Sequence, residues 1–431
     1  MSSRDGGLPA WQRTLTATAA TTAPGLLVRL SGGAAPYPVQ FVAYGTAVVA
    51  AAFMLAWACE AAQVDFAHGI VVAAVAFVAI LPEFIVEVHF ALTAQAQYVT
   101  ANLTGASRLL LGFAVALPAA VALLPGRRRL GPLELAPPHR IELAILALGA
   151  LWSMRGVLAG KLTLLDSVVL ISMYGLYLRR VARAGGESAP PLGVAEQLAE
   201  LPKEDRRRWV GGLMLFAAAV ILLTAVPFGD AVLGSGALVG ISPYLLLQWI
   251  VPVATETPEL VVAFVLLTHG RGGQSIAVLL AGAVSQYTLA LGVLPLAYAA
   301  GTASGPLPLA GRERVELLLT VGVALYAVAA LVNLRLSRGD SSIMLALFAG
   351  QLLLPSVVVR IVFAVMFWAV ALDVLAAERR RLPALAAALR SPRATRAAPA
   401  ATPPSDRDRS RRDRSHRRSP SAGAGGRSRR P

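Results

Sequence analysis

Long apolar runs separated by short polar stretches occupy most of the chain. Each run holds roughly 20 residues, which is enough for a helix to cross a hydrocarbon core of about 30 Å. The runs lie at about 40–60, 68–95, 98–124, 141–159, 162–178, 209–228, 240–268, 274–300 and 313–333. A last stretch, 341–377, contains Pro355 and Arg360 and is either one long kinked helix or two short helices. The pattern predicts an all-α polytopic membrane protein with ten transmembrane helices, or eleven if the last stretch is divided.

The composition agrees with this class. The chain of 431 residues is 56% hydrophobic and only 15% charged, whereas a soluble domain carries about a quarter charged residues. The alternating pattern of a membrane β-barrel is absent. Residues 379–431 hold sixteen Arg and three Asp, so a net +13 of the total +15 belongs to this tail, and no nucleic-acid partner is expected. A single cysteine, Cys59, excludes an intrachain disulfide and a cysteine metal cluster, and no resident cofactor is expected.

Charge and composition also divide the chain into segments. The predicted order is a weakly ordered leader (1–38), a first half with five helices (39–178), a basic cytoplasmic loop (179–208), a second half with five or six helices (209–378) and an Arg-rich disordered tail (379–431). The Lys and Arg residues after the third and fifth helices place those loops in the cytoplasm and the N-terminus outside. Ten helices would leave the tail outside, and eleven would bring it inside. We expect a multi-pass protein of the cell (inner) membrane, with the lipid bilayer and inorganic cations as its partners.

A proline followed by a glutamate interrupts two of the apolar runs. The first is LPEFIVEV (81–88) with Glu83, and the second is TPELVVAF (257–264) with Glu259. In both halves an apolar half-helix, the Pro-Glu pair, a second half-helix, a short polar turn and a helix with small and polar residues follow one another in this order. Five membrane crossings separate the two Pro-Glu helices, so they enter the membrane from opposite sides. This arrangement predicts two inverted repeats.

Proline and glutamate together indicate an ion site. Proline breaks a helix and frees backbone carbonyls, which a membrane protein tolerates only where they line a cavity or pack on protein. Glu83 and Glu259 are expected to meet at mid-membrane, where facing carboxylates make a site for a hard cation. Without a cation the carboxylates repel each other, and one takes up a proton. The chain is not expected to be an enzyme, because Glu87-Val88-His89 lacks the first histidine of a His-Glu-x-x-His zinc motif.

These motifs resemble those of the calcium/cation antiporter superfamily, which includes sodium/calcium and cation/proton exchangers. The stretch Ala254-Thr255-Glu256-Thr257-Pro258-Glu259 stands where the family has Gly-Thr-Ser-Leu-Pro-Glu, and Leu81-Pro82-Glu83 keeps the end of that motif in the first repeat. Asn102 and Gly105 match the family pattern of the next helix. The resemblance implies a secondary antiporter that exchanges Ca2+ or Na+ for Na+ or H+ by alternating access. It implies cation binding by Glu83, Glu259, Thr255 and Asn102, with Ser107 and Ser285 as further oxygen ligands.

Several positions depart from the family pattern and leave alternatives open. Ala79 and Ile80 remove hydroxyls from the first repeat, and Glu256 adds a carboxylate. Glu87 either extends the ion path or pairs with Arg108, which could also replace a second cation as a fixed positive charge. His89 is either an interfacial residue or a proton relay, and Gln286 is a polar candidate on the eighth helix. The helices at 40–60 and 209–228 are candidates for a sliding gate. A transport-inactive sensor or scaffold of the same fold is the alternative function.

Overall fold

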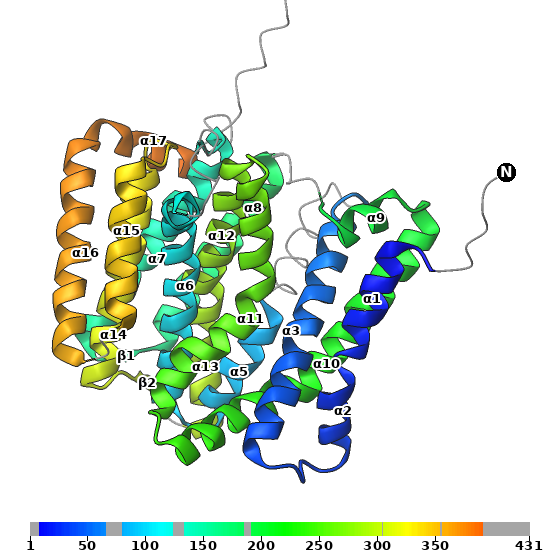
Figure 1. Ribbon diagram of the computed structural model, residues 1–431. Helices are drawn as coiled ribbons and strands as arrows, with labels where there is room; N and C mark the ends of the chain where they lie inside the picture. The colour runs from blue at the N-terminus through cyan, green and yellow to red at the C-terminus, as the bar shows by residue number, and fades with distance from the viewer. Residues whose placement is uncertain are drawn as a thin grey trace, which may run out of the picture. The chain divides into compact units, whose positions relative to one another are not determined.

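Helices make up nearly all of the chain that the computed structural model describes, namely residues 8–65, 80–123, 133–184, 191–303, 305–353 and 356–390 (Figure 1). The first half contains α1 (Ala10–Ala20), α2 (Ala23–Leu30), α3 (Tyr37–Ala62), α5 (Leu81–Leu92), α6 (Ala96–Ala122), η1 (Pro137–His139), α7 (Arg140–Ala159), β1 (Lys161–Leu162), α8 (Leu164–Ala184) and α9 (Val194–Glu200). The second half contains α10 (Lys203–Val239), α11 (Pro243–Thr268), α12 (Gly272–Ser285), η2 (Gln286–Ala290), α13 (Leu291–Thr302), β2 (Leu307–Pro308), α14 (Gly311–Leu331), α15 (Arg338–Leu353), α16 (Val357–Ala377), η3 (Arg379–Arg381) and α17 (Leu382–Arg390). The described elements belong to one unit, Met1–Thr395, and β1 pairs antiparallel with β2.

The helices confirm the predicted class of fold. Among the described residues, eight helical segments are long and apolar enough to cross a membrane, so the chain is a multi-pass integral membrane protein. The stretch 341–377 is divided into α15 and α16, which is the second of the two alternatives. The predicted span 68–95 is seen only from residue 80 onward, because 66–79 lie outside the described residues.

The polar segments hold more helix than the sequence predicts. The leader contains α1 and α2, and α2 packs so closely on α3 that a Cβ on Gly25 would lie 2.6 Å from the Cβ of Ala47. The basic loop contains the end of α8, all of α9 and the start of α10. The predicted tail begins with η3 and α17, and the remainder of it, beyond residue 390, lies outside the described residues.

Helices α3 and α10 pack along each other and are covered on one side by α1 and α2 (Figure 1). The buried face of α3 consists largely of alanine, which lets the two helix backbones approach closely. At one end Arg206 of α10 donates to Asp65, which follows α3, with Nε 3.1 Å from Oδ2. These hydrogen bonds lower the pKa of the Asp65 carboxyl, so the pair stays charged at neutral pH.

Helix α6 is almost entirely buried. It packs on α11, α14 and α15, and α14 in turn packs on α7 and α16. The packing of the two Pro-Glu units is reciprocal: α6 follows α5 but packs on α11, while α13 follows α11 and α12 but packs on α5. Two repeats that pack into each other are expected to show such contacts between helices of different repeats. That the repeats are inverted relative to each other stays a prediction.

The contact between α6 and α11 depends on Gly105. A Cβ at this position would lie 1.8 Å from the carbonyl oxygen of Gln248 on α11. That carbonyl has no intrahelical donor, because Pro252, four residues later, lacks an N–H. The predicted break at Pro258 is not seen, since α11 continues as one helix through both prolines. The backbone that the prolines free is tolerated in a membrane where a neighbouring helix packs against it.

We expect Gly105→Ala to lower the melting temperature of the detergent-purified protein. Overpacking a core costs about 1–3 kcal/mol, and here the added methyl meets a backbone atom that cannot change rotamer. Gly211→Ala is the control, because a Cβ at Gly211 meets nothing within 4 Å. Equal melting temperatures for the two variants would contradict the close contact of α6 with α11.

A buried ion network joins α6 to α14 and α16. Arg108 Nη2 lies 2.8 Å from Glu316 Oε2, and Arg360 Nη1 contacts the other oxygen of the same carboxylate. Arg108 also donates from Nη1 to Gln351 Oε1 at 2.9 Å, and its guanidinium lies 5.3 Å from the centre of the Trp249 ring. The network therefore ties α6 and α11 to the helices α14–α16.

Replacing Glu316 by Gln should destabilise the protein strongly. Removal of one partner from a buried ion pair costs about 3–5 kcal/mol, because the remaining charges stay buried without compensation. Thermal unfolding in detergent should report this loss. Glu134→Gln provides the matched comparison, since its ion pair with Arg335 is at least half exposed and is worth at most about 1 kcal/mol. A smaller loss for Glu316→Gln than for Glu134→Gln would be incompatible with the network as a structural anchor.

Candidate functional site

Two buried carboxylates lie one turn apart at the start of α5. Pro82 occupies the first turn of the helix, where its missing N–H leaves no intrahelical bond unmade. Glu83 is 2% exposed, and Glu87 is completely buried. In the part of the chain that the structure describes, no Lys, Arg or His forms an ion pair with either carboxylate. The two groups are therefore buried without a compensating positive charge there.

Asn102 on α6 connects these two carboxylates. Its side-chain Nδ2 donates to Glu83 Oε1 at 3.5 Å and to Glu87 Oε1 at 3.4 Å. The amide is fully buried, and its oxygen, Oδ1, has no donor among the described residues. Asn102 therefore holds both carboxylates with its nitrogen and leaves its oxygen available to a ligand.

Gln286 makes the corresponding bridge from the second half of the chain. Its Nε2 donates to Glu83 Oε2 and, at 3.3 Å, to Glu256 Oε1 on α11. Gln286 is the first residue of η2, a π-helical turn between α12 and α13. Such turns are frequent at functional sites, because they displace a side chain from its α-helical position. The backbone irregularity in this half lies at Gln286 and not at Pro258.

Glu256 is the carboxylate of α11 that lies next to Glu83. The two carboxyl groups are within hydrogen-bonding reach of each other. The sequence predicts Glu259 in this position, but no hydrogen bond joins Glu259 to Glu83 among the described residues. Glu259, one turn further along α11, lies within electrostatic reach of Glu256 and of Glu60 on α3. It thus extends the cluster toward α3.

Four buried oxygen atoms around this cluster have no hydrogen-bond donor in the described part of the chain: Glu87 Oε2, Asn102 Oδ1, Glu259 Oε2 and Gln286 Oε1. Buried polar atoms are normally hydrogen-bonded, so several orphaned oxygens in one region indicate a binding site. No three acidic, Cys or His side chains among the described residues are close enough to hold a metal ion by themselves. A cation here would therefore need the amide oxygens as well as the carboxylates.

The other predicted site residues lie at various distances from the cluster. Thr255 is buried beside Glu256, and its hydroxyl donates to the Val251 carbonyl at 3.1 Å. Ser107 and Ser285 are buried, and Ser285 bonds within its own helix to Ala281. Neither serine donates to the carboxylates of the cluster among the bonds described.

The basic candidates do not join the cluster. Arg108 is bound to Glu316, so the predicted alternative of a Glu87–Arg108 pair is wrong, and Arg108 is not placed as a substitute for a bound cation. The ring of His89 lies 5.6 Å from that of Phe90 and makes no described hydrogen bond to Glu83 or Glu87. The two alternatives for His89, an interfacial residue and a proton relay, both stay predictions.

Sequence reasoning missed a buried amide on α11, between this site and the start of the helix. Gln248 on α11 is fully buried and donates from Nε2 to Thr104 Oγ1 at 3.4 Å. Its own Oε1 has no donor among the described residues. The sequence contained a signal for this residue, namely a single glutamine in the apolar run YLLLQWIVP. Gln248 stands seven residues, or about two helical turns, before Thr255, so the two lie on the same face of the helix.

Comparison with known proteins agrees with the motifs. The family model described as sodium/calcium exchanger protein matches residues 37–182 and 209–357. The structure of the H+/Ca2+ exchanger CAX is similar at 32% identity and TM-score 0.81, covering 88% of this chain and 98% of that one. No curated protein matches.

Two more distant structures share the fold. The sodium-calcium exchanger NCX_Mj is similar at 17% identity and TM-score 0.52, covering 74% of this chain and 98% of that one. Native YfkE is similar at 16% identity and TM-score 0.55, covering 81% of this chain and 98% of that one. The chain therefore belongs to the sodium/calcium exchanger protein family, a family of cation antiporters.

Proposed function

We propose that the chain exchanges a divalent cation, Ca2+ in the first instance, for protons across the cell (inner) membrane. The observation that carries this proposal is the group of buried oxygens at Glu87, Asn102, Glu259 and Gln286 that have no donor among the described residues. Carboxylate and amide oxygens are the ligands that Ca2+ takes, in numbers of six to eight. Glu83 and Glu256, which share the amide of Gln286, complete the negative charge of the site.

Exchange follows from the charge balance of this cluster. Closely spaced carboxylates in a low-dielectric interior cannot all stay ionised without a cation among them. A divalent cation neutralises two carboxylates, and two protons do the same. The site is therefore occupied either by the cation or by protons, and the two compete for the same oxygens. This competition is the condition for an antiporter, because each ion must displace the other.

Two features favour protons over sodium as the coupling ion. Just before α5, Ile80 stands where the family motif has a hydroxyl side chain. Ala79, the other position at which the motif loses a hydroxyl, lies outside the described residues. A sodium site built only from carboxylates and two amides would lack the neutral hydroxyl oxygens of the family pattern. The similar protein CAX is an H+/Ca2+ exchanger.

Alternating access is assigned to the pair α3 and α10. These helices lie beside the cluster, since α3 packs on α11 and α10 packs on both α5 and α11. The ion network of Arg108, Glu316 and Arg360 ties the site helices to α14–α16 on the other side. A slide of α3 and α10 over the fixed site helices would open the cluster to one side of the membrane and then to the other.

Neutralising the cluster should abolish exchange. We expect Glu83→Gln and Glu256→Gln to reduce Ca2+ flux in proteoliposomes to background, because each removes a charge that both the cation and the proton require. Glu259→Gln tests the position that the family motif predicts and should also abolish flux if Glu259 supplies a ligand. Glu134→Gln, at the half-exposed ion pair with Arg335, should transport normally. Normal flux in both Glu83→Gln and Glu256→Gln would show that the ion site lies elsewhere.

The coupling ion is tested by imposing one gradient at a time on the reconstituted wild-type protein. An outward proton gradient should drive Ca2+ uptake, and the protons that leave should acidify the external medium. A sodium gradient at constant pH should drive no uptake. Uptake driven by sodium alone would replace the proton by Na+ in this proposal. A folded protein that shows no flux under any gradient would favour the transport-inactive scaffold.

A further inference from the structure

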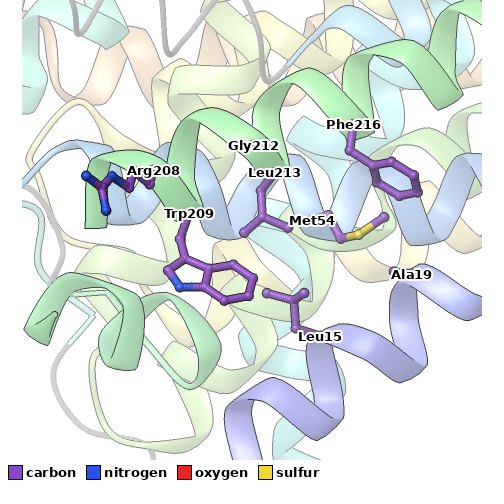
Figure 2. Close-up of a pocket in the computed structure, with 8 residues that line it drawn as sticks. All are labelled: Leu15, Ala19, Met54, Arg208, Trp209, Gly212, Leu213 and Phe216. Atoms are coloured by element: carbon purple, nitrogen blue, oxygen red, sulfur yellow. The ribbon is translucent and has the colours of Figure 1, made fainter. Parts of the chain in front are cut away.

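An apolar groove opens between α1, α3 and α10, away from the carboxylate cluster (Figure 2). Its volume is about 370 Å³, which lies within the range of about 300–1,000 Å³ typical of ligand pockets. The apolar wall is formed by Leu15, Ala19, Met54, Gly212, Leu213 and Phe216. Leu15, Met54 and Leu213 are buried at its floor, while Phe216 is 39% exposed at its edge. The groove is therefore a site for a chain of hydrocarbon and not for a polar ligand.

One end of the groove is polar and aromatic. Arg208 and Trp209, both on α10, line this end (Figure 2). The Trp209 ring meets the Trp11 ring edge-on at a centroid distance of 5.4 Å. Tryptophan is enriched at the level of the lipid headgroups. Eight residues separate Arg208 from Phe216, which corresponds to about 12 Å along a helix axis. The groove therefore runs from headgroup depth into the hydrocarbon region.

The charge at this end is available to an anion. The start of α10 carries Lys203 and three consecutive arginines. Arg206 and Arg207 face Asp65. Arg208, whose side chain is 77% exposed, has contacts of only 3.9 Å with Glu204 and Asp205 on its own helix. Exposed pairs of this kind contribute little, so Arg208 can exchange them for a phosphate.

We propose that this groove binds one anionic phospholipid, with an acyl chain along the apolar wall and the headgroup phosphate on Arg208. The order of the side chains along α10 matches the order of the parts of a lipid: cation, interfacial tryptophan, then apolar residues. A basic patch attracts anionic lipid with about 1 kcal/mol per Lys or Arg near the surface. A bound peptide would need partners for its backbone polar groups, and the apolar wall offers none.

The site has a consequence for transport that rests on the proposed function. The groove is formed between α1 and the pair α3 and α10, to which alternating access is assigned above. A lipid lodged there contacts both α3 and α10, so it has to move with them when they slide over the site helices. Anionic lipid would then alter the rate of exchange and not the identity of the ion carried. Binding itself does not depend on which ions are exchanged.

Quenching of tryptophan fluorescence by brominated lipid tests the binding directly. The full-length protein is reconstituted in phosphatidylcholine, and phosphatidylglycerol or phosphatidylcholine with dibrominated acyl chains is titrated in. The difference between wild type and Trp209→Phe isolates the emission of Trp209. We expect half-maximal quenching of Trp209 at a mole fraction about fivefold lower for phosphatidylglycerol than for phosphatidylcholine, which corresponds to about 1 kcal/mol. Arg208→Gln should remove this preference.

Two glycines on α10 provide a matched pair for the acyl chain. Gly212 lines the groove and Gly211 does not, and a Cβ at either position meets nothing within 4 Å. Gly212→Phe should fill the groove and remove the lipid preference, while Gly211→Phe should leave it unchanged. Equal quenching by the two lipids in the wild type would identify ordinary boundary lipid and overturn the proposal. Equal behaviour of Gly212→Phe and Gly211→Phe would likewise show that no chain enters the groove.

Discussion

The organisation of this protein depends on how it compensates charge that is buried inside a membrane. A charged side chain at the bilayer centre costs about 2.5–3.5 kcal/mol on insertion scales, so such residues persist where they are paired or functional. The described helices contain both cases. Glu316 is enclosed by Arg108 and Arg360 and forms a closed network. Glu83 and Glu87 accept hydrogen bonds from the amides of Asn102 and Gln286, and these donors carry no charge. The carboxylate of the first network faces fixed positive charge, and among the described residues the carboxylates of the second do not.

The backbone around the incomplete cluster shows why small irregularities matter. Pro82 starts α5 just before Glu83, and Pro252 and Pro258 lie within α11 on either side of Glu256. The π-turn at Gln286 brings an amide from the third helix of the second unit to both carboxylates. None of these features stops a helix within the described residues. Each instead changes the direction of a side chain or the hydrogen bonding of a carbonyl, while the surrounding helices keep the backbone buried.

Sequence reasoning reached the fold, and the helices that carry the candidate site, for physical reasons. Membrane spans are readable because the bilayer sets both their length and their polarity. The pairing of Pro82 with Glu83 and of Pro258 with Glu259 identified the helices that supply the carboxylates. The sequence could not show whether Glu256 or Glu259 lies next to Glu83, because both residues lie near one face of α11. The π-turn, whose Gln286 bonds to Glu256, leaves no pattern of hydrophobic and polar residues by which it could be recognised. The partner of Arg108 was equally unreadable, since Glu316 is more than two hundred positions away and only tertiary packing joins them.

The two sides of the molecule differ in how easily they can move. A shift of α6 relative to α14 or α16 would separate Arg108 and Arg360 from Glu316, leaving charges buried without partners, and breaking such a pair costs about 3–5 kcal/mol. Among the described residues, no ion pair joins α3 or α10 to the site helices α5 and α11, and Gly229 of α10 packs there on Phe90 and Val86 of α5. Apolar surfaces of small residues exchange one set of van der Waals contacts for a similar set when they slide. This difference supports the assignment of alternating access to α3 and α10. On that proposal, a lipid in the groove beside α10 would act on the helix pair that slides.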